Sequence, residues 1–232
     1  MITSSDKDIR PYKEALRITS GLLIVFVLLG SLAGCSVFKR KKEAPPAEKK
    51  AVVKSPEAQY QEVLNKWTSG IKLYEGFEAK LYMSATYKGP EFRKAYIQRY
   101  AAGYQLEEGY KNALLERELE QADKYNEFFF SAYTPDEKWN DFNQPNSVWK
   151  LYLEDNLGNR LSPVSISKVN NSDPLIREFF PYLDLWSTGY IVRFPKYSET
   201  GTEPIPGENT KFLKLIATGV LAKGELVWKL KD

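Results

Sequence analysis

The densest group of side chains that could do chemistry is the run from Asp136 to Asp141, which holds three carboxylates, a lysine and a tryptophan. Paired carboxylates beside an aromatic ring are the equipment of glycoside cleavage, which makes Asp136, Glu137 and Asp141 the candidate acids. The run also has the composition of a turn between strands whose Trp139 folds back as a plug, and we favour this second interpretation. It does not match a calcium-binding loop, in which acids alternate around a central glycine.

Composition excludes most other catalytic and metal sites. The 232 residues include no His and one Cys, which rules out His-dependent nucleophilic catalysis, imidazole ligation, an intramolecular disulfide and a cysteine zinc site. Ser165, Ser167 and Lys168 lack the helical Ser-x-x-Lys context, and on a strand the two serines face away from the lysine. No glycine-rich phosphate loop precedes a helix. We therefore predict no catalytic residue, no metal and no cofactor.

Residues 1–34 have the three parts of an export signal. A charged opening stretch is followed by an apolar run from Leu22 to Leu29 and then by small residues before Cys35. The apolar run is short for a membrane span, which needs about 20 residues. We predict a signal peptide over 1–34. The alternative is an uncleaved anchor with a spare thiol, which the basic run 39–42 favours because positive charge usually stays cytoplasmic.

The four residues Leu32-Ala33-Gly34-Cys35 resemble the lipobox of bacterial lipoproteins. The resemblance implies diacylation of the Cys35 thiol, cleavage before Cys35 and acylation of the new amino group. Three acyl chains hold a protein firmly, whereas one is a marginal anchor. Ser36, in place of Asp, implies transport to the outer membrane, with the protein facing the periplasm. The resemblance covers the signal segment only, and the rest of the chain resembles no specific family.

Residues 35–54 differ in composition from residues 55–232. They carry a net charge of +5 and residues 1–34 carry +1, so the whole-chain charge of +3 leaves −3 for 55–232. Pro45 and Pro46 break any helix, and the like charges predict an extended tether. The tether is a solvated spacer or a contact with anionic lipid headgroups. Nucleic acid is not an expected partner, because the basic charge lies outside the folded part.

Residues 55–232 form one globular domain with two predicted helical regions. Ser55 followed by Pro56 is a strong start signal and predicts a helix over 56–68. Residues 90–122 predict one kinked helix or a pair. Aromatic residues recur every four positions there, at 92, 96, 100 and 104, and we expect them to make core contacts, with Arg93 on another face.

Period-two alternation predicts strands over 77–87 and over most of 125–230. About seven short strands with turns between them indicate a mainly β fold, an antiparallel two-sheet sandwich of Ig-like architecture with the helical segment inserted after the first strand. The alternative is an α+β domain with helices on one face of a single sheet.

The aromatic segment 179–186 is a buried plug or an exposed patch that docks a partner or a lipid-like ligand.

We predict a membrane-anchored envelope lipoprotein whose non-enzymatic domain contacts another envelope protein, for example through an edge strand. The alternatives are a cell-wall or glycan hydrolase using the 136–141 carboxylates, and a carrier of an apolar ligand.

Overall fold

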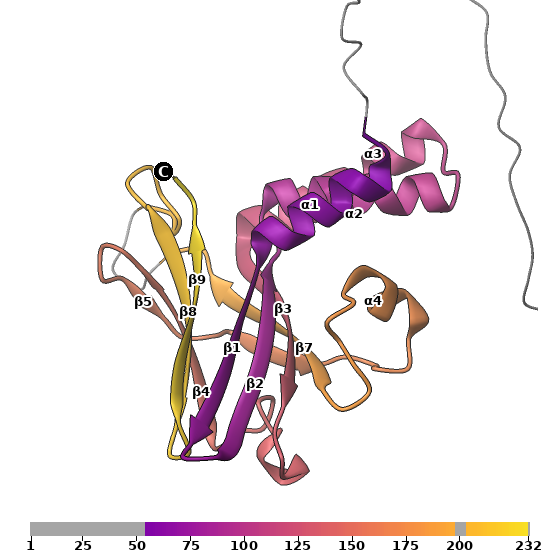
Figure 1. The fold of residues 1–232 in the computed structure, drawn as a ribbon. Helices are drawn as coiled ribbons and strands as arrows, with labels where there is room; N and C mark the ends of the chain where they lie inside the picture. Colours follow the sequence, from indigo (N-terminus) through magenta and orange to yellow (C-terminus); the bar gives the residue numbers. More distant parts are fainter. Residues whose placement is uncertain (1–53, 198–202, 232) are drawn as a thin grey trace, which may run out of the picture. The chain divides into compact units, whose positions relative to one another are not determined.

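The chain folds as an α+β domain of two antiparallel sheets and, within the described residues, four α-helices (Figure 1). The computed structural model describes residues 54–197 and 203–231. The lipobox, Cys35 and nearly all of the tether lie outside these residues. The prediction of two antiparallel sheets is confirmed. The fold class is α+β, as in the alternative, and not mainly β, but the single sheet of that alternative is wrong.

Each sheet is built from neighbours that all run antiparallel. The five-stranded sheet has the spatial order β1-β2-β3-β7-β6 and the four-stranded sheet has the order β5-β4-β8-β9. The bounds of the first sheet are β1 (Thr68–Glu75), β2 (Glu78–Tyr87), β3 (Tyr125–Tyr133), β7 (Thr188–Pro195) and β6 (Ser165–Lys168). Those of the second are β5 (Arg160–Leu161), β4 (Trp149–Asp155), β8 (Phe212–Gly219) and β9 (Lys223–Lys229).

Three helices lie together at one end of the five-stranded sheet (Figure 1). They are α1 (Pro56–Trp67), α2 (Pro90–Gly103) and α3 (Glu108–Lys124), while α4 (Pro174–Phe179) precedes β7. The Ser55 hydroxyl caps α1 by accepting from the Ala58 amide at 3.2 Å, as its sequence predicts. Residues 90–122 form a pair of helices and not one kinked helix, since the chain reverses at Gln105 with a positive φ of 52°.

The inner faces of both sheets contribute to one apolar core. The Phe128 ring of β3 lies 4.9 Å from the Trp228 ring of β9. The Trp228 indole N–H donates to the Trp67 carbonyl at 2.7 Å, which ties β9 to the end of α1. The predicted inward residues of β4, Trp149, Leu151 and Leu153, are all buried.

Two strands depart from the sequence predictions. Strand β1 was not expected, because only two of its residues, Ile71 and Leu73, carry the apolar alternation and pack against the core. Residues 161–169, which alternate like one strand within the predicted 125–230 region, are divided between the sheets as β5 and β6, with Pro163 at the crossing. A proline cannot donate to a sheet ladder, which explains the interruption.

Candidate functional site

A row of small side chains crosses the outer face of the five-stranded sheet, the face that points away from the core. Gly70 of β1 pairs with Ser84 of β2, and Ser84 pairs with Ser131 of β3. Ser131 in turn pairs with Gly189 of β7. Side chains of one row lie on the same face of a sheet, so this row leaves a hollow that runs across the strands.

Large side chains border this hollow on both sides and turn it into a groove of about 880 Å³, here called the sheet groove. One wall is the next cross-strand row, Lys72, Tyr82 and Tyr133. Tyr74 continues this wall, and the Tyr82 ring lies 5.6 Å from that of Tyr74 and 5.5 Å from that of Tyr133. The other wall is the loop 182–187, which includes Trp186.

The groove closes at its β7 end. A Cβ placed on Gly189 would lie 2.6 Å from Val169 Cγ2 and 3.3 Å from the Leu183 methyl groups, so this end of the row is covered. The Tyr182 hydroxyl hydrogen-bonds with Thr86 Oγ1 at 2.6 Å. Burial raises the pKa of Tyr182 well above its usual range, so the phenol stays neutral. The floor of the groove therefore consists of Gly70 and Ser84, which are accessible, and of Ser131, which is 4% exposed.

Hydrogen bonds between backbone amides and side chains fix the loop that carries Trp186. The Asp184 carboxylate accepts from the amides of Trp186 at 2.9 Å and Ser187 at 2.8 Å. The Ser187 hydroxyl accepts from the Asp184 amide at 3.2 Å. Trp186 nevertheless remains 78% exposed. The loop thus presents a large aromatic ring to solvent from a fixed backbone, and such preorganisation lowers the entropic cost of binding.

The aromatic segment 179–186 divides between its two predicted roles. Phe179, Phe180 and Leu183 are buried, and the Phe180 ring stacks on Phe129 at 3.9 Å, as a plug would. Leu185 is 75% exposed like its neighbour Trp186. The sequence did not indicate the floor of the groove. The sequence shows the small outward residues of β2 and β3. The row that they form with Gly70 cannot be recognised from the sequence, because β1 was not predicted.

Two of the three candidate acids of the 136–141 run, Asp136 and Asp141, bind groups of their own turn, while Glu137 is exposed. The Asp136 carboxylate accepts from the Lys138 amide at 2.9 Å. The Asp141 carboxylate accepts from the Ser147 hydroxyl at 2.8 Å. The run contains the short 3₁₀-helix η1 (Glu137–Trp139) and is followed by Phe142, which is 3% exposed. These contacts are those of a turn that closes over the core.

Two other kinds of site were considered in the sequence, a Ser-Lys catalytic pair and a metal site. Ser165, Ser167 and Lys168 lie on β6, opposite Arg193, Ile191 and Tyr190 of β7 respectively, so the lysine faces away from both serines. Within the described ranges, no group of three or more His, Cys, Asp or Glu side chains is placed to hold a metal ion. No helix among the residues described is long and apolar enough to cross a membrane.

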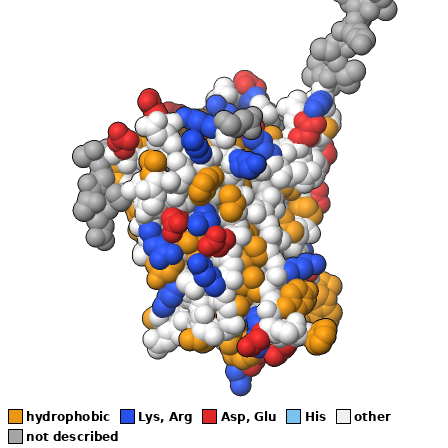
Figure 2. Space-filling view, turned by 60° about the vertical axis from the view of Figure 1, so that its left-hand side comes forward, with side chains coloured by type: hydrophobic (Ala, Val, Ile, Leu, Met, Phe, Trp, Pro, Cys, Tyr) orange, Lys and Arg blue, Asp and Glu red, His pale blue; other side chains and the backbone are white. Residues whose placement is uncertain are grey.

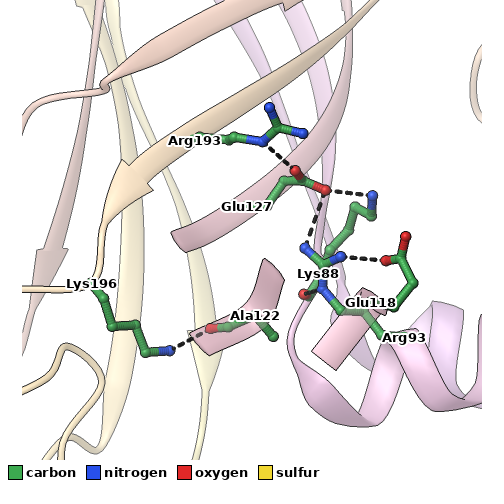
Figure 3. Close-up of polar contacts among 7 residues, drawn as sticks. All are labelled: Lys88, Arg93, Glu118, Ala122, Glu127, Arg193 and Lys196. Carbon is green, nitrogen blue, oxygen red and sulfur yellow. Dashed lines mark hydrogen bonds and ion pairs between the residues drawn. The ribbon is translucent and has the colours of Figure 1, made fainter. Parts of the chain in front are cut away.

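A cluster of ionisable side chains lies where α2 and α3 meet the five-stranded sheet (Figure 3). Glu127 of β3 accepts from Lys88 at 2.5 Å and Arg93 at 3.2 Å through one oxygen, and from Arg193 at 2.6 Å through the other. Arg93 also contacts Glu118 of α3. The side chains of Glu127 and Arg93 are only 3% and 1% exposed. We call these five residues the Glu127 cluster.

The charges in this cluster control the ionisation of Glu127. Burial alone would raise the pKa of its carboxyl, but Lys88 and Arg93, with hydrogen bonds from Lys88 and Arg193, hold the pKa at about 2. Both carboxylate oxygens are occupied, so the cluster fastens the helices to the sheet and offers no free oxygen to a ligand. The sequence did not indicate that Arg93 is buried, because its partner Glu127 is remote in sequence.

The four-stranded sheet carries opposite charges side by side. Lys214 lies within 3.4 Å of both Glu154 and Glu225. Figure 2 shows Lys and Arg side chains mixed with Asp and Glu on the face turned forward, with hydrophobic side chains gathered at the lower end of the view. The sheet groove is therefore the feature that best fits a binding site.

No protein-family model, curated protein or solved structure significantly matches this chain.

Proposed function

We propose that this chain is a membrane-anchored lipoprotein of the bacterial envelope whose non-enzymatic domain holds a protein partner in the sheet groove. The observation that carries the binding role is the groove itself. Its volume of about 880 Å³ falls within the range of ligand sites, and Tyr and Trp line it. Such side chains combine a large apolar surface with a polar group and are enriched at protein interfaces.

The anchor is supported by the coincidence of the lipobox with the single cysteine of the chain, Cys35. Acylation there would attach the domain to a membrane, and Ser36 favours the outer membrane with the domain in the periplasm. The tether, with its net charge of +5, would space the domain from the lipid surface and contact anionic headgroups.

We also propose that the two sheets pack as a sandwich of the kind expected from the sequence. Support comes from the contact between Phe128 and Trp228 across the sheets. The Phe142 ring adds to it, since it lies 5.3 Å from Phe130 of the first sheet and 5.8 Å from Trp149 of the second. In a sandwich the outer face of the five-stranded sheet lies away from the second sheet, and the groove occupies the part of it that Phe180 does not cover.

A cross-linking pull-down from the native envelope tests anchor and groove together. The variants are Cys35→Ser, which removes the acylation site, and Ser84→Trp, which fills the open floor with an indole. We expect Cys35→Ser to leave the membrane fraction and to lose its envelope partner. Ser84→Trp should remain in the membrane and lose the same partner, with an unchanged melting temperature because the new ring enters open space.

Val227→Trp is the matched control, because Val227 lies on β9 and is 47% exposed at a position outside the groove. This variant should recover the partner as the wild type does. Retention of the partner by Ser84→Trp would exclude the groove as the binding site. Retention of Cys35→Ser in the membrane would refute lipid anchoring and favour an uncleaved anchor.

A further inference from the structure

The polar groups that the sheet groove leaves unused are chiefly hydrogen-bond donors. Ser131 donates to the Tyr182 carbonyl at 3.3 Å, and Tyr82 bonds to the Tyr74 hydroxyl at 2.8 Å. Among the lining side chains, Lys72, Ser84, Tyr133 and Trp186 have no hydrogen-bond partner in the described residues. Asp184 accepts through Oδ1 alone, so its Oδ2 is the unused acceptor of the lining. Lys and Trp only donate, while Ser and Tyr do either. The matching ligand presents acceptors along its length.

The ligand must also be narrow and extended. The floor spans β1 to β3, a distance of about 10 Å at the usual spacing of strands. A polyproline II segment rises about 3.1 Å per residue, so three to four residues fill this floor. Such a segment leaves its carbonyl groups free and has no N–H at proline, so it offers acceptors without competing donors. Aromatic-lined grooves bind proline-rich segments in this way.

The charge of the groove selects among such segments. Lys72 is exposed on β1, with its ammonium 5.5 Å from the centre of the Tyr82 ring, and no carboxylate of the described residues pairs with it. The one acid that lines the groove, Asp184, lies in the opposite wall, where its Oδ1 accepts two backbone N–H groups. The free charge at the Tyr82 wall is therefore positive, and a carboxylate on the ligand complements it.

We propose that the sheet groove binds an extended, proline-rich protein segment that carries an acidic residue, with the prolines against Tyr82, Tyr133 and Trp186 and the carboxylate at Lys72. This inference rests on the proposed binding role of the groove and names its ligand class. Because a polyproline II segment is largely preformed, little conformational entropy is lost when it binds.

The test uses the full chain in detergent micelles and a fluorescein-labelled peptide, Ala-Pro-Pro-Glu-Pro-Pro-Ala, blocked at both ends, with fluorescence anisotropy as the readout. We expect Trp186→Ala to weaken binding about tenfold or more, since an aromatic anchor is typically a hot spot. Leu185→Ala is the matched control, because Leu185 is equally exposed beside it and does not line the groove. That variant should bind within about twofold of the wild type.

A charge exchange tests the contact with Lys72. Lys72→Glu should weaken the Glu peptide about fivefold and strengthen the corresponding Lys peptide by a similar factor, as expected for an exposed ion pair. A peptide with Gly and Ser in place of the prolines should bind much more weakly. Equal binding of the Gly-Ser and proline peptides, or no effect of the charge exchange, would overturn the proposed ligand class.

A glycan is the competing occupant of an aromatic groove. Under the proposal, chitohexaose does not displace the peptide, and displacement that Trp186→Ala abolishes would show that the groove is a sugar site instead. The experiments can disprove the ligand class without disproving the binding role of the groove. If Ser84→Trp loses the envelope partner but neither peptide binds the wild type, the groove still binds a partner and only its assigned chemistry is wrong.

Discussion

Glu127→Gln is expected to lower the free energy of unfolding by about 3–5 kcal/mol, the cost of removing one partner from a buried ion pair. The reason is that Arg93, which is 1% exposed, and Lys88 would lose their shared carboxylate while remaining in place. Glu118 would then be the remaining anion of the cluster, and it contacts Arg93 only from the α3 side. Urea unfolding followed by tryptophan fluorescence at pH 7 measures the change.

The same variant should change the response to acid. The pKa of Glu127 is about 2 in the folded chain, against an ordinary value of 4.5. Its ionisation therefore stabilises the fold fully above pH 4.5, and this contribution, about 3 kcal/mol, is lost as the pH falls from 4.5 towards 2. Because Gln does not titrate, the difference between wild type and Glu127→Gln should shrink over this range.

Glu62→Gln is the control for the Glu127 prediction. Glu62 also pairs with a lysine, Lys54, but its side chain is 59% exposed. Exposed pairs contribute about 0–1 kcal/mol, so this variant should unfold almost as the wild type does. A loss below about 1 kcal/mol for Glu127→Gln, or an unchanged pH dependence, would show that the cluster does not fasten the helices to the sheet.

Trp228→Ala is expected to cost about 3–5 kcal/mol, the range for truncating a large buried aromatic. Trp228 is 2% exposed and lies between the two sheets, against Phe128. Its loss would leave a cavity and would also remove the donor to the Trp67 carbonyl, whose desolvation would then be uncompensated. The measurement is again urea unfolding, with the midpoint and slope compared with those of the wild type.

Two further substitutions separate packing from the hydrogen bond. Trp228→Phe keeps an aromatic ring but removes the N–H, so it should cost less than Trp228→Ala. Val227→Thr changes the neighbouring residue, which is 47% exposed and on the other face of β9, and should stay within about 0.5 kcal/mol of the wild type. A Trp228→Ala variant as stable as Val227→Thr would contradict the contact between the sheets.

Local patterns in the sequence predicted most of the elements. Alternation over 77–87 matches β2, which begins at Glu78, and the start signal at Ser55 places α1 correctly. Alternation did not reveal β1, because only Ile71 and Leu73 of this strand are apolar and face the core, and two such positions make too short a pattern. It also merged β5 with β6, since a strand that changes sheets keeps its local composition.

The binding features depend on contacts that local patterns cannot reveal. The sheet groove arises because Gly70, Ser84 and Ser131 come into register from three strands, the last of which comes after two helices. The Glu127 cluster likewise joins Arg93 to residues 34 and 25 positions away. Of the groove, composition indicated only the aromatic segment that contains Trp186. The exposure of the Trp186 side chain depends on the turn that Asp184 holds through its hydrogen bonds.

Site-specific photo-cross-linking in intact cells tests most directly that the sheet groove is where this protein meets its partner. Benzoylphenylalanine is placed at Tyr133, in the groove wall, and at Val227, outside the groove, in otherwise wild-type chains. We predict a defined cross-linked protein from position 133, absent from position 227 and lost when Ser84→Trp is added. Cross-links to the same protein from both positions, or none from position 133, would contradict a partner site in the groove.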